Sequence, residues 1–298
     1  MTLWEKFPGV KWGGPKNWDA PSATGSWTNI TERDRKLIPA ILLTLFVGII
    51  LIGSIFQTSV MVVVVYSVTA VFAMVVFGLS SVKRGSFLEF IGLGDPTKTG
   101  VYVKQGLLLT LIFTFISLGL VGLTQQSFTP VVPQSLVDTN FPTRVAEIAR
   151  QSIVHEDHLQ ALAFIVLGAI VIASVETFLI AIILASLVRS RGINNGIVAT
   201  TLVRILAHYG PLWVLAAGFT ENLWPLFLSG VFLIVTAPYV LSARSIIPKW
   251  TTHSGVNTVA YALLVFPTLI SDTLQPLTNP IVAGAGVLIC AKMLKDLK

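Results

Sequence analysis

The chain has 298 residues, of which 54% are hydrophobic and only 11% are charged, and its mean hydropathy is +0.81. This composition excludes an ordinary soluble globular protein, which could not bury so much apolar surface, and predicts an integral membrane protein. The net charge of +6 indicates basic loops on one side of a membrane rather than a nucleic-acid partner. A single cysteine, Cys290, excludes an intrachain disulfide framework and a cysteine-based metal site.

The predicted fold is an all-α polytopic membrane protein with about eight transmembrane helices. A helix needs about 20 apolar residues to cross ~30 Å of hydrocarbon. Stretches of this kind cover residues 37 to 56, 60 to 80, 105 to 123, 160 to 188, 195 to 217, 223 to 243, 254 to 271 and 277 to 293. We therefore divide the chain into a leader (1–36), a first helix pair (37–80), a cytoplasmic connection (81–104) and a six-helix domain (105–298) with an external loop (124–159).

Basic residues predict the orientation, because cytoplasmic loops retain Lys and Arg. Alternate connections hold 17 of the 20 basic residues, namely Lys6, Lys11, Lys16, Arg33, Arg35, Lys36, Lys83, Arg84, Lys98, Lys104, Arg189, Arg191, Arg244, Lys249, Lys292, Lys295 and Lys298. The opposite side has only Arg144 and Arg150, and Arg204 lies within a span. Both termini are therefore expected in the cytoplasm. The leader lacks a signal-peptide or transit-peptide pattern, which predicts location in the cytoplasmic (inner) membrane.

The leader carries four tryptophans, Trp4, Trp12, Trp18 and Trp27. Two interpretations stay open. The indole rings could lie at the level of the lipid headgroups, where Trp is enriched. Alternatively, the leader is an arm that docks another protein, because Trp side chains are frequent anchors at protein interfaces.

Two connections have predicted structure of their own. Residues 81 to 100 mix apolar and basic residues before a Gly-Asp-Pro turn, which predicts a short amphipathic helix on the cytoplasmic surface. The external loop contains an amphipathic stretch from Thr143 that is expected to lead into the fourth span, and the loop ends at His155-Glu156-Asp157-His158. The two histidines, three residues apart, could share a helix face and bind a metal. The pattern offers no further ligand nearby, which favours a hydrated helix start whose acidic residues face the positive end of the helix dipole.

Polar residues inside the apolar stretches are the candidate site. Glu176, Arg204 and His208 lie within spans, and His253 and Asn257 lie at the start of another. An ionisable side chain at the bilayer centre costs roughly 2.5–3.5 kcal/mol on insertion scales, so such a residue is a functional candidate. Residues four apart share a helix face, which pairs Arg204 with His208 and His253 with Asn257.

The spacing also predicts a common depth for two of these residues. Glu176 lies 13 residues before Arg189 at the cytoplasmic end of its span, or about 20 Å at ~1.5 Å per residue. His208 lies 13 residues after Asn195 in the next span, which runs in the opposite direction. We therefore expect the Glu176 and His208 side chains to meet on adjacent antiparallel helices, with Arg204 pointing at the same carboxylate.

In their order along the chain, these residues resemble motifs of the CAAX prenyl protease and bacteriocin-processing family of intramembrane glutamate endopeptidases. Members of that family carry a Glu-Glu-x-x-x-Arg, a Phe-x-x-x-His and a His-x-x-x-Asn motif on separate helices. The counterparts here are VETFLIA around Glu176, RILAH ending at His208, and HSGVN from His253 to Asn257. The chain departs from the pattern in having a single Glu without the following Arg, and Arg204 in place of the Phe. The similar region has its core at about 160–271.

The resemblance implies a hydrolase. Glu176 would activate a water that attacks a peptide carbonyl, His208 would assist proton transfer, and His253 with Asn257 would stabilise the oxyanion. This scheme needs no metal and no cofactor.

Arg204 leaves an alternative open. Its guanidinium could replace the missing motif arginine and orient Glu176, or it could form a structural ion pair in a noncatalytic member of the family. Such a member would serve as a membrane subunit or scaffold that docks a larger assembly through its leader. A transporter is a third interpretation. The expected partners are membrane lipid together with either a peptide substrate or a protein complex, and no nucleic acid.

Overall fold

The computed structural model describes residues 7–8, 96–124, 141–214, 223–243, 245–266 and 269–297. Every regular element in these ranges is helical, which confirms the all-α prediction. The elements are α5 (Pro96–Thr124), α7 (Phe141–Val154), α8 (His158–Arg191), α9 (Ile193–Val214), α10 (Leu223–Ala243), α11 (Ile247–Val265), η3 (Ile270–Leu274), η4 (Gln275–Thr278) and α12 (Pro280–Asp296). The predicted spans at 37–56 and 60–80, the cytoplasmic helix up to residue 95, and the four leader tryptophans lie outside the described residues.

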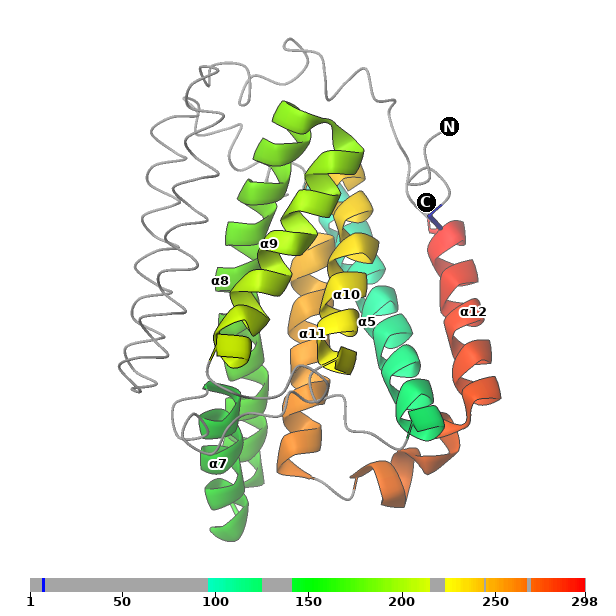
Figure 1. The fold of residues 1–298 in the computed structure, drawn as a ribbon. Helices are drawn as coiled ribbons and strands as arrows, with labels where there is room; N and C mark the ends of the chain where they lie inside the picture. The colour runs from blue at the N-terminus through cyan, green and yellow to red at the C-terminus, as the bar shows by residue number, and fades with distance from the viewer. Residues whose placement is uncertain are drawn as a thin grey trace.

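The long helices run side by side as one bundle (Figure 1). α11 lies near its centre and packs against α5, α8 and α10, while α12 packs on α5 and α9 packs on α8 and α10. Within the described ranges, two stretches are long and apolar enough to cross a membrane, Lys98–Thr124 and His158–Phe178, and Phe227–Ala243 is a shorter apolar helix. The part of the chain that the structure describes is therefore helical and compatible with a membrane protein.

α8 and α9 form an antiparallel pair around a one-residue connection. Gly192 between them has φ +79°, a left-handed conformation that glycine adopts without strain. At its other end, α8 begins at Asp157, whose side chain accepts a hydrogen bond from the Gln160 amide at 2.9 Å. The antiparallel pairing places Glu176 near the middle of α8 and Arg204 near the middle of α9.

The start of α11 corrects one prediction. The sequence places Lys249 in a cytoplasmic loop and begins the seventh span at residue 254, whereas α11 begins at Ile247 and buries Lys249 completely. Pro248 suits the first turn of a helix, and the Ser245 hydroxyl accepts a hydrogen bond from the Ile247 amide at 3.1 Å. Hydropathy misses this start because a lysine lowers the mean of the first turn.

α5 and α11 approach closely at two glycines. A Cβ added at Gly106 of α5 would collide with Thr251 and the Pro248 carbonyl, and one added at Gly255 of α11 would collide with Thr110. The Thr252 hydroxyl also donates to the Gly106 carbonyl at 3.2 Å. This contact fixes the segment of α11 that carries Lys249 and His253.

The external loop contains a separate helix, α7, rather than an extension of the fourth span. Glu156, with φ +61°, lies in the middle of the connection between α7 and α8. Val145, Ala146 and Ala149 of α7 pack in a hydrophobic cluster with α8 and with Tyr261 of α11. α7 therefore covers the ends of α8 and α11 that lie away from the α8–α9 turn (Figure 1).

Candidate functional site

Three of the candidate residues meet inside the bundle, each from a different helix. Arg204 Nε of α9 donates to Glu176 Oε1 of α8 at 2.7 Å, and His253 Nε2 of α11 lies 3.5 Å from Glu176 Oε2. The exposed fractions are 6% for Glu176 and Arg204 and 4% for His253. The carboxylate therefore has a cationic partner at one oxygen and an imidazole at the other.

Further hydrogen bonds orient Arg204 and His253. Arg204 Nη1 donates to the carbonyl of Ser229 on α10 at 2.9 Å, so its guanidinium bridges α8 and α10. His253 Nδ1 lies 3.2 Å from the Thr177 hydroxyl. Because the other ring nitrogen faces Glu176, the imidazole plane is held between two neighbouring residues of α8. The site is thus built with fixed side-chain directions.

The Phe232 ring of α10 forms the apolar floor of this cluster. The guanidinium carbon of Arg204 lies 4.7 Å from the ring centroid and Lys249 Nζ lies 5.6 Å from it. The rings of Phe232 and His253 pack at 5.3 Å with an interplanar angle of 56°. Two cations within about 6 Å of one aromatic ring are attracted by its negative face.

Lys249 is the site residue that sequence reasoning missed. It is fully buried, it lies within electrostatic range of Glu176 and Arg204, and Nζ has no hydrogen-bond partner among the described residues. The positive-inside rule assigned it to a loop because it is basic and lies between two apolar stretches. The signal that could have found it is its spacing: Lys249 lies four residues before His253, on the same helix face.

The other predicted residues are placed as follows. His208 lies on α9 one turn after Arg204, and its side chain is outside the described residues. Asn257 lies on α11 one turn after His253 and is half-buried, and among the described residues no hydrogen bond joins it to Glu176. Of the contacts expected from the sequence, the structure therefore shows those of Glu176 with Arg204 and with His253.

His155 and His158 do not share a helix. His155 lies in the turn before α8, whereas His158 is the first residue of α8, and both are exposed. The described ranges contain no group of three or more His, Cys, Asp or Glu positioned to hold a metal ion. Asp157 caps α8, which agrees with the interpretation of this stretch as a helix start.

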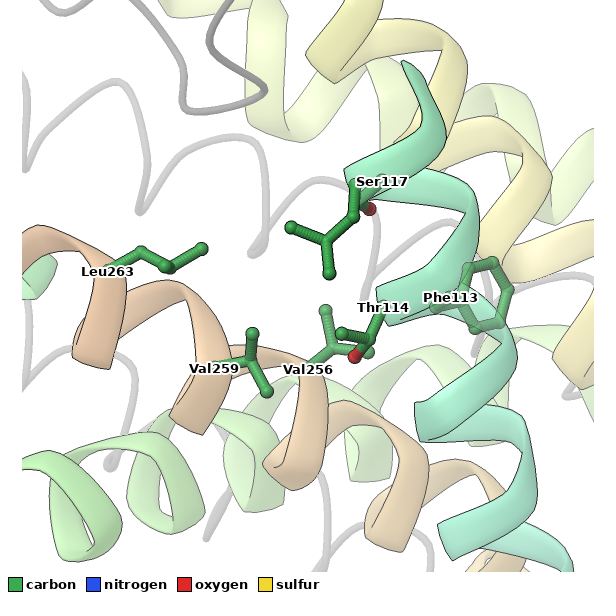
Figure 2. Close-up of a pocket in the computed structure, with 7 residues that line it drawn as sticks. Phe113, Thr114, Ser117, Val256, Val259 and Leu263 are labelled. Atoms are coloured by element: carbon green, nitrogen blue, oxygen red, sulfur yellow. The ribbon is translucent and has the colours of Figure 1, made fainter. Parts of the chain in front are cut away.

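A small cavity of about 20 Å³ lies between α5 and α11 (Figure 2). It is lined by Phe113, Thr114, Ser117, Leu118, Val256, Val259 and Leu263. Phe113 also packs against Phe232 at 5.1 Å between ring centroids. Phe113 therefore lies between the cavity and the Phe232 ring of the charged cluster. The Glu176 carboxylate does not line the cavity.

Two residues of the leader contact the bundle. The Tyr239 hydroxyl of α10 donates to the Pro8 carbonyl at 2.6 Å. Phe7 packs against apolar residues of α8 and α10 and against those of α5 and α12. This part of the leader is thus bound to its own chain, while Trp4, Trp12, Trp18 and Trp27 lie outside the described residues.

Comparisons with protein-family models, with curated proteins and with solved structures found no match to this chain.

Proposed function

We propose that the chain is a multi-pass membrane protein with about eight helices and cytoplasmic termini, and that it hydrolyses a peptide bond at Glu176. The observation that carries the hydrolase proposal is the contact of Glu176 with two different groups, Arg204 at Oε1 and His253 at Oε2. This pairing of a buried carboxylate with an imidazole agrees with the arrangement that the resemblance to intramembrane glutamate peptidases implies.

The surface of the bundle supports the membrane part of the proposal. Large apolar side chains are exposed along several helices, among them Leu107, Leu167, Leu202, Ile281 and Leu288. A protein in water seldom exposes so many large apolar side chains, whereas lipid solvates them. The α8 helix has 34 residues, about 50 Å at ~1.5 Å per residue, so it would cross the hydrocarbon and extend beyond it.

The proposed reaction uses Oε2 of Glu176, the carboxylate oxygen that faces His253. Glu176 Oε2 accepts a proton from a water molecule as the water oxygen attacks the peptide carbonyl carbon. His253 stabilises the oxyanion that forms on the carbonyl oxygen, with Asn257 assisting. When the C–N bond breaks, the proton passes to the leaving amine, with His208 assisting, and the products are a carboxylic acid and an amine. Arg204 holds the carboxylate in position and takes the place of the arginine that the motif lacks.

Isotope labelling tests this proposal without a known substrate. The full chain is reconstituted in vesicles with a pool of membrane-anchored peptides of randomised sequence, in water enriched in ¹⁸O. Mass spectrometry should find new carboxyl termini that contain ¹⁸O, and Glu176→Gln should lower their yield by about 10²-fold or more. Lys292→Gln, at an exposed position of α12, is the matched control and should cleave normally. Equal cleavage by the Glu176→Gln variant, or none by folded wild-type protein, would overturn the proposal.

Cysteine labelling tests the orientation. In a Cys290→Ala background, a single cysteine replaces exposed Asn195 near the α8–α9 turn or exposed Glu156 near the start of α8. In intact cells, a membrane-impermeant maleimide should label position 156 and leave position 195 unlabelled. The opposite result would reverse the proposed orientation, and labelling of both positions would contradict a membrane-spanning α8.

A noncatalytic membrane subunit is the second candidate, and one observation favours it. Both oxygens of Glu176 are already engaged, and the cluster is more than nine-tenths buried. In that case the cluster would join α8, α9 and α11 and the leader would dock a partner. Folded protein that cleaves no peptide, yet unfolds at a much lower temperature as the Glu176→Gln variant, would favour this second function.

A further inference from the structure

Lys249 is a buried basic residue whose charge, when the amine is protonated, meets no hydrogen-bond acceptor among the described residues. The Lys249 side chain is completely buried. Its Nζ lies above the Phe232 ring and has no hydrogen-bond acceptor among the described residues. A buried ammonium group of this kind is costly unless an anion accompanies it. Cation–π attraction to Phe232 offsets only part of that cost.

The neighbouring carboxylate is directed elsewhere. Glu176 accepts from Arg204 at one oxygen and faces His253 with the other, and no hydrogen bond joins it to Lys249. In the described part of the cluster, two cations, Arg204 and Lys249, thus lie near a single carboxylate. One further negative charge would neutralise them, whereas a dianion would leave an excess of negative charge.

A second buried donor lies beside Arg204. The backbone carbonyl of Ser229 accepts from Arg204 Nη1, and the Ser229 hydroxyl is buried without a hydrogen-bond partner in the described residues. Buried polar side chains are nearly always paired with protein, water or ligand. Lys249 Nζ and Ser229 Oγ are therefore two buried donors without acceptors among the described residues. Lys249 shares the Phe232 ring with Arg204, and Ser229 is hydrogen-bonded to Arg204 through its carbonyl.

We propose that Lys249 and Arg204 bind one carboxylate group of a ligand beside the Phe232 ring, with Ser229 as an additional donor. A carboxylate has the single charge that the cluster lacks and accepts several charge-assisted hydrogen bonds. Two sources share this chemistry, the free carboxyl terminus of a peptide and a fatty acid. The site does not depend on hydrolysis, because it can be detected by binding alone, so its failure and the failure of the proposed peptidase are distinguishable.

The test uses the purified full chain in detergent, with acetate as the probe. The ionic strength is held constant with sodium sulfate, and acetamide serves as the neutral analogue of acetate. Acetate should raise the Tm of the wild-type protein in a saturable way, because a ligand that binds only the folded state stabilises it. Acetamide should leave the Tm unchanged.

Substitutions then assign the effect to Lys249. Lys249→Met should weaken apparent acetate affinity by about tenfold or more, Lys249→Arg should retain binding, and Lys292→Met should behave as wild type. Should Lys249→Met fail to fold, Lys249→Gln replaces it, and line broadening of ¹³C-acetate in NMR gives a second measure of binding. No saturable effect on wild-type protein, or an equal effect on the folded Lys249 variants without charge, would overturn the proposal.

Two further ligands distinguish the sources of the carboxylate. Lys249-dependent binding of decanoate that is much tighter than that of acetate would identify a fatty-acid site. Lys249-dependent preference for a short peptide with a free carboxyl terminus over its carboxamide would identify a peptide site. Both outcomes support the proposed carboxylate site.

Discussion

Arg204 and Glu176 form a hydrogen-bonded ion pair between adjacent antiparallel helices, with 2.7 Å between Nε and Oε1. Each side chain is 7% exposed, so solvent screens the pair little. The same guanidinium donates to the Ser229 carbonyl, which ties a third helix to the pair. Loss of Arg204 should therefore weaken the packing of α8, α9 and α10 together.

Replacement of Arg204 by Met should destabilise the protein strongly. Removal of one partner from a buried ion pair costs about 3–5 kcal/mol, because the other charge remains buried without its counter-charge. The double variant Glu176→Gln with Arg204→Met should recover part of this loss. Thermal unfolding of both single variants and the double variant gives the coupling energy, and strictly additive effects would contradict a direct interaction between the two side chains.

Replacement of Thr177 by Val should loosen the orientation of His253. The substitution keeps the shape of the side chain and removes the hydroxyl that lies 3.2 Å from His253 Nδ1. We expect a loss of about 1 kcal/mol in the free energy of unfolding, together with lower cleavage if the site is a peptidase. Thr258→Val is the matched control, because the Thr258 hydroxyl bonds only within its own helix to the Ser254 carbonyl. A loss no larger than that of the control would argue against a positioning role for Thr177.

A valine should destabilise the protein more at Gly255, in the close contact between α5 and α11, than at Gly284 in α12. Gly255→Val places a side chain against Thr110 and should destabilise the protein by about 1–3 kcal/mol through overpacking. Gly284→Val in α12, where a Cβ would meet nothing within 4 Å, should have a much smaller effect. Tm values of the two variants in the same detergent check this difference, and equal values would mean that the helices can separate at little cost.

Replacement of Asp157 by Ala should fray the start of α8. The Asp157 side chain accepts from the Gln160 amide, and loss of such a cap costs about 0.5–2 kcal/mol. Asp157→Asn, which also caps well, should retain the wild-type behaviour. Hydrogen–deuterium exchange over residues 158–161 is the measurement. Unchanged protection in Asp157→Ala would show that packing of α7, rather than the cap, holds this helix end.

The sequence predicted the helices most accurately where hydropathy changes sharply. The bounds of α10 agree with the predicted 223–243, because polar residues stand at both ends of a strongly apolar stretch. The start of α11 was predicted too late, because hydropathy cannot distinguish a buried lysine from one in a loop. α7 was not predicted as a separate helix, because the turn at Glu156 depends on a backbone conformation that its composition does not indicate.

The site was predictable in part for a similar reason. Helical spacing on antiparallel neighbours predicted a common depth for Glu176 and His208 and directed Arg204 toward the same carboxylate. The structure shows the contact of Arg204 with Glu176, whereas the His208 side chain lies outside the described residues. The role of Phe232 was not predictable, because α10 has several apolar and aromatic residues and only the packing shows which one faces the cations. The burial of Lys249 was not predictable without the correct start of α11 and without knowing which face of α11 points into the bundle.

The contact between Pro8 and Tyr239 joins positions 231 residues apart in the chain. It cannot form until the ribosome has synthesised α10, so Pro8 remains without this contact during most of translation. Contacts of such long sequence separation form late, because a large loop has to close first. Docking of Phe7 and Pro8 is therefore expected among the last steps of folding, and it would mark a chain whose helices have already assembled.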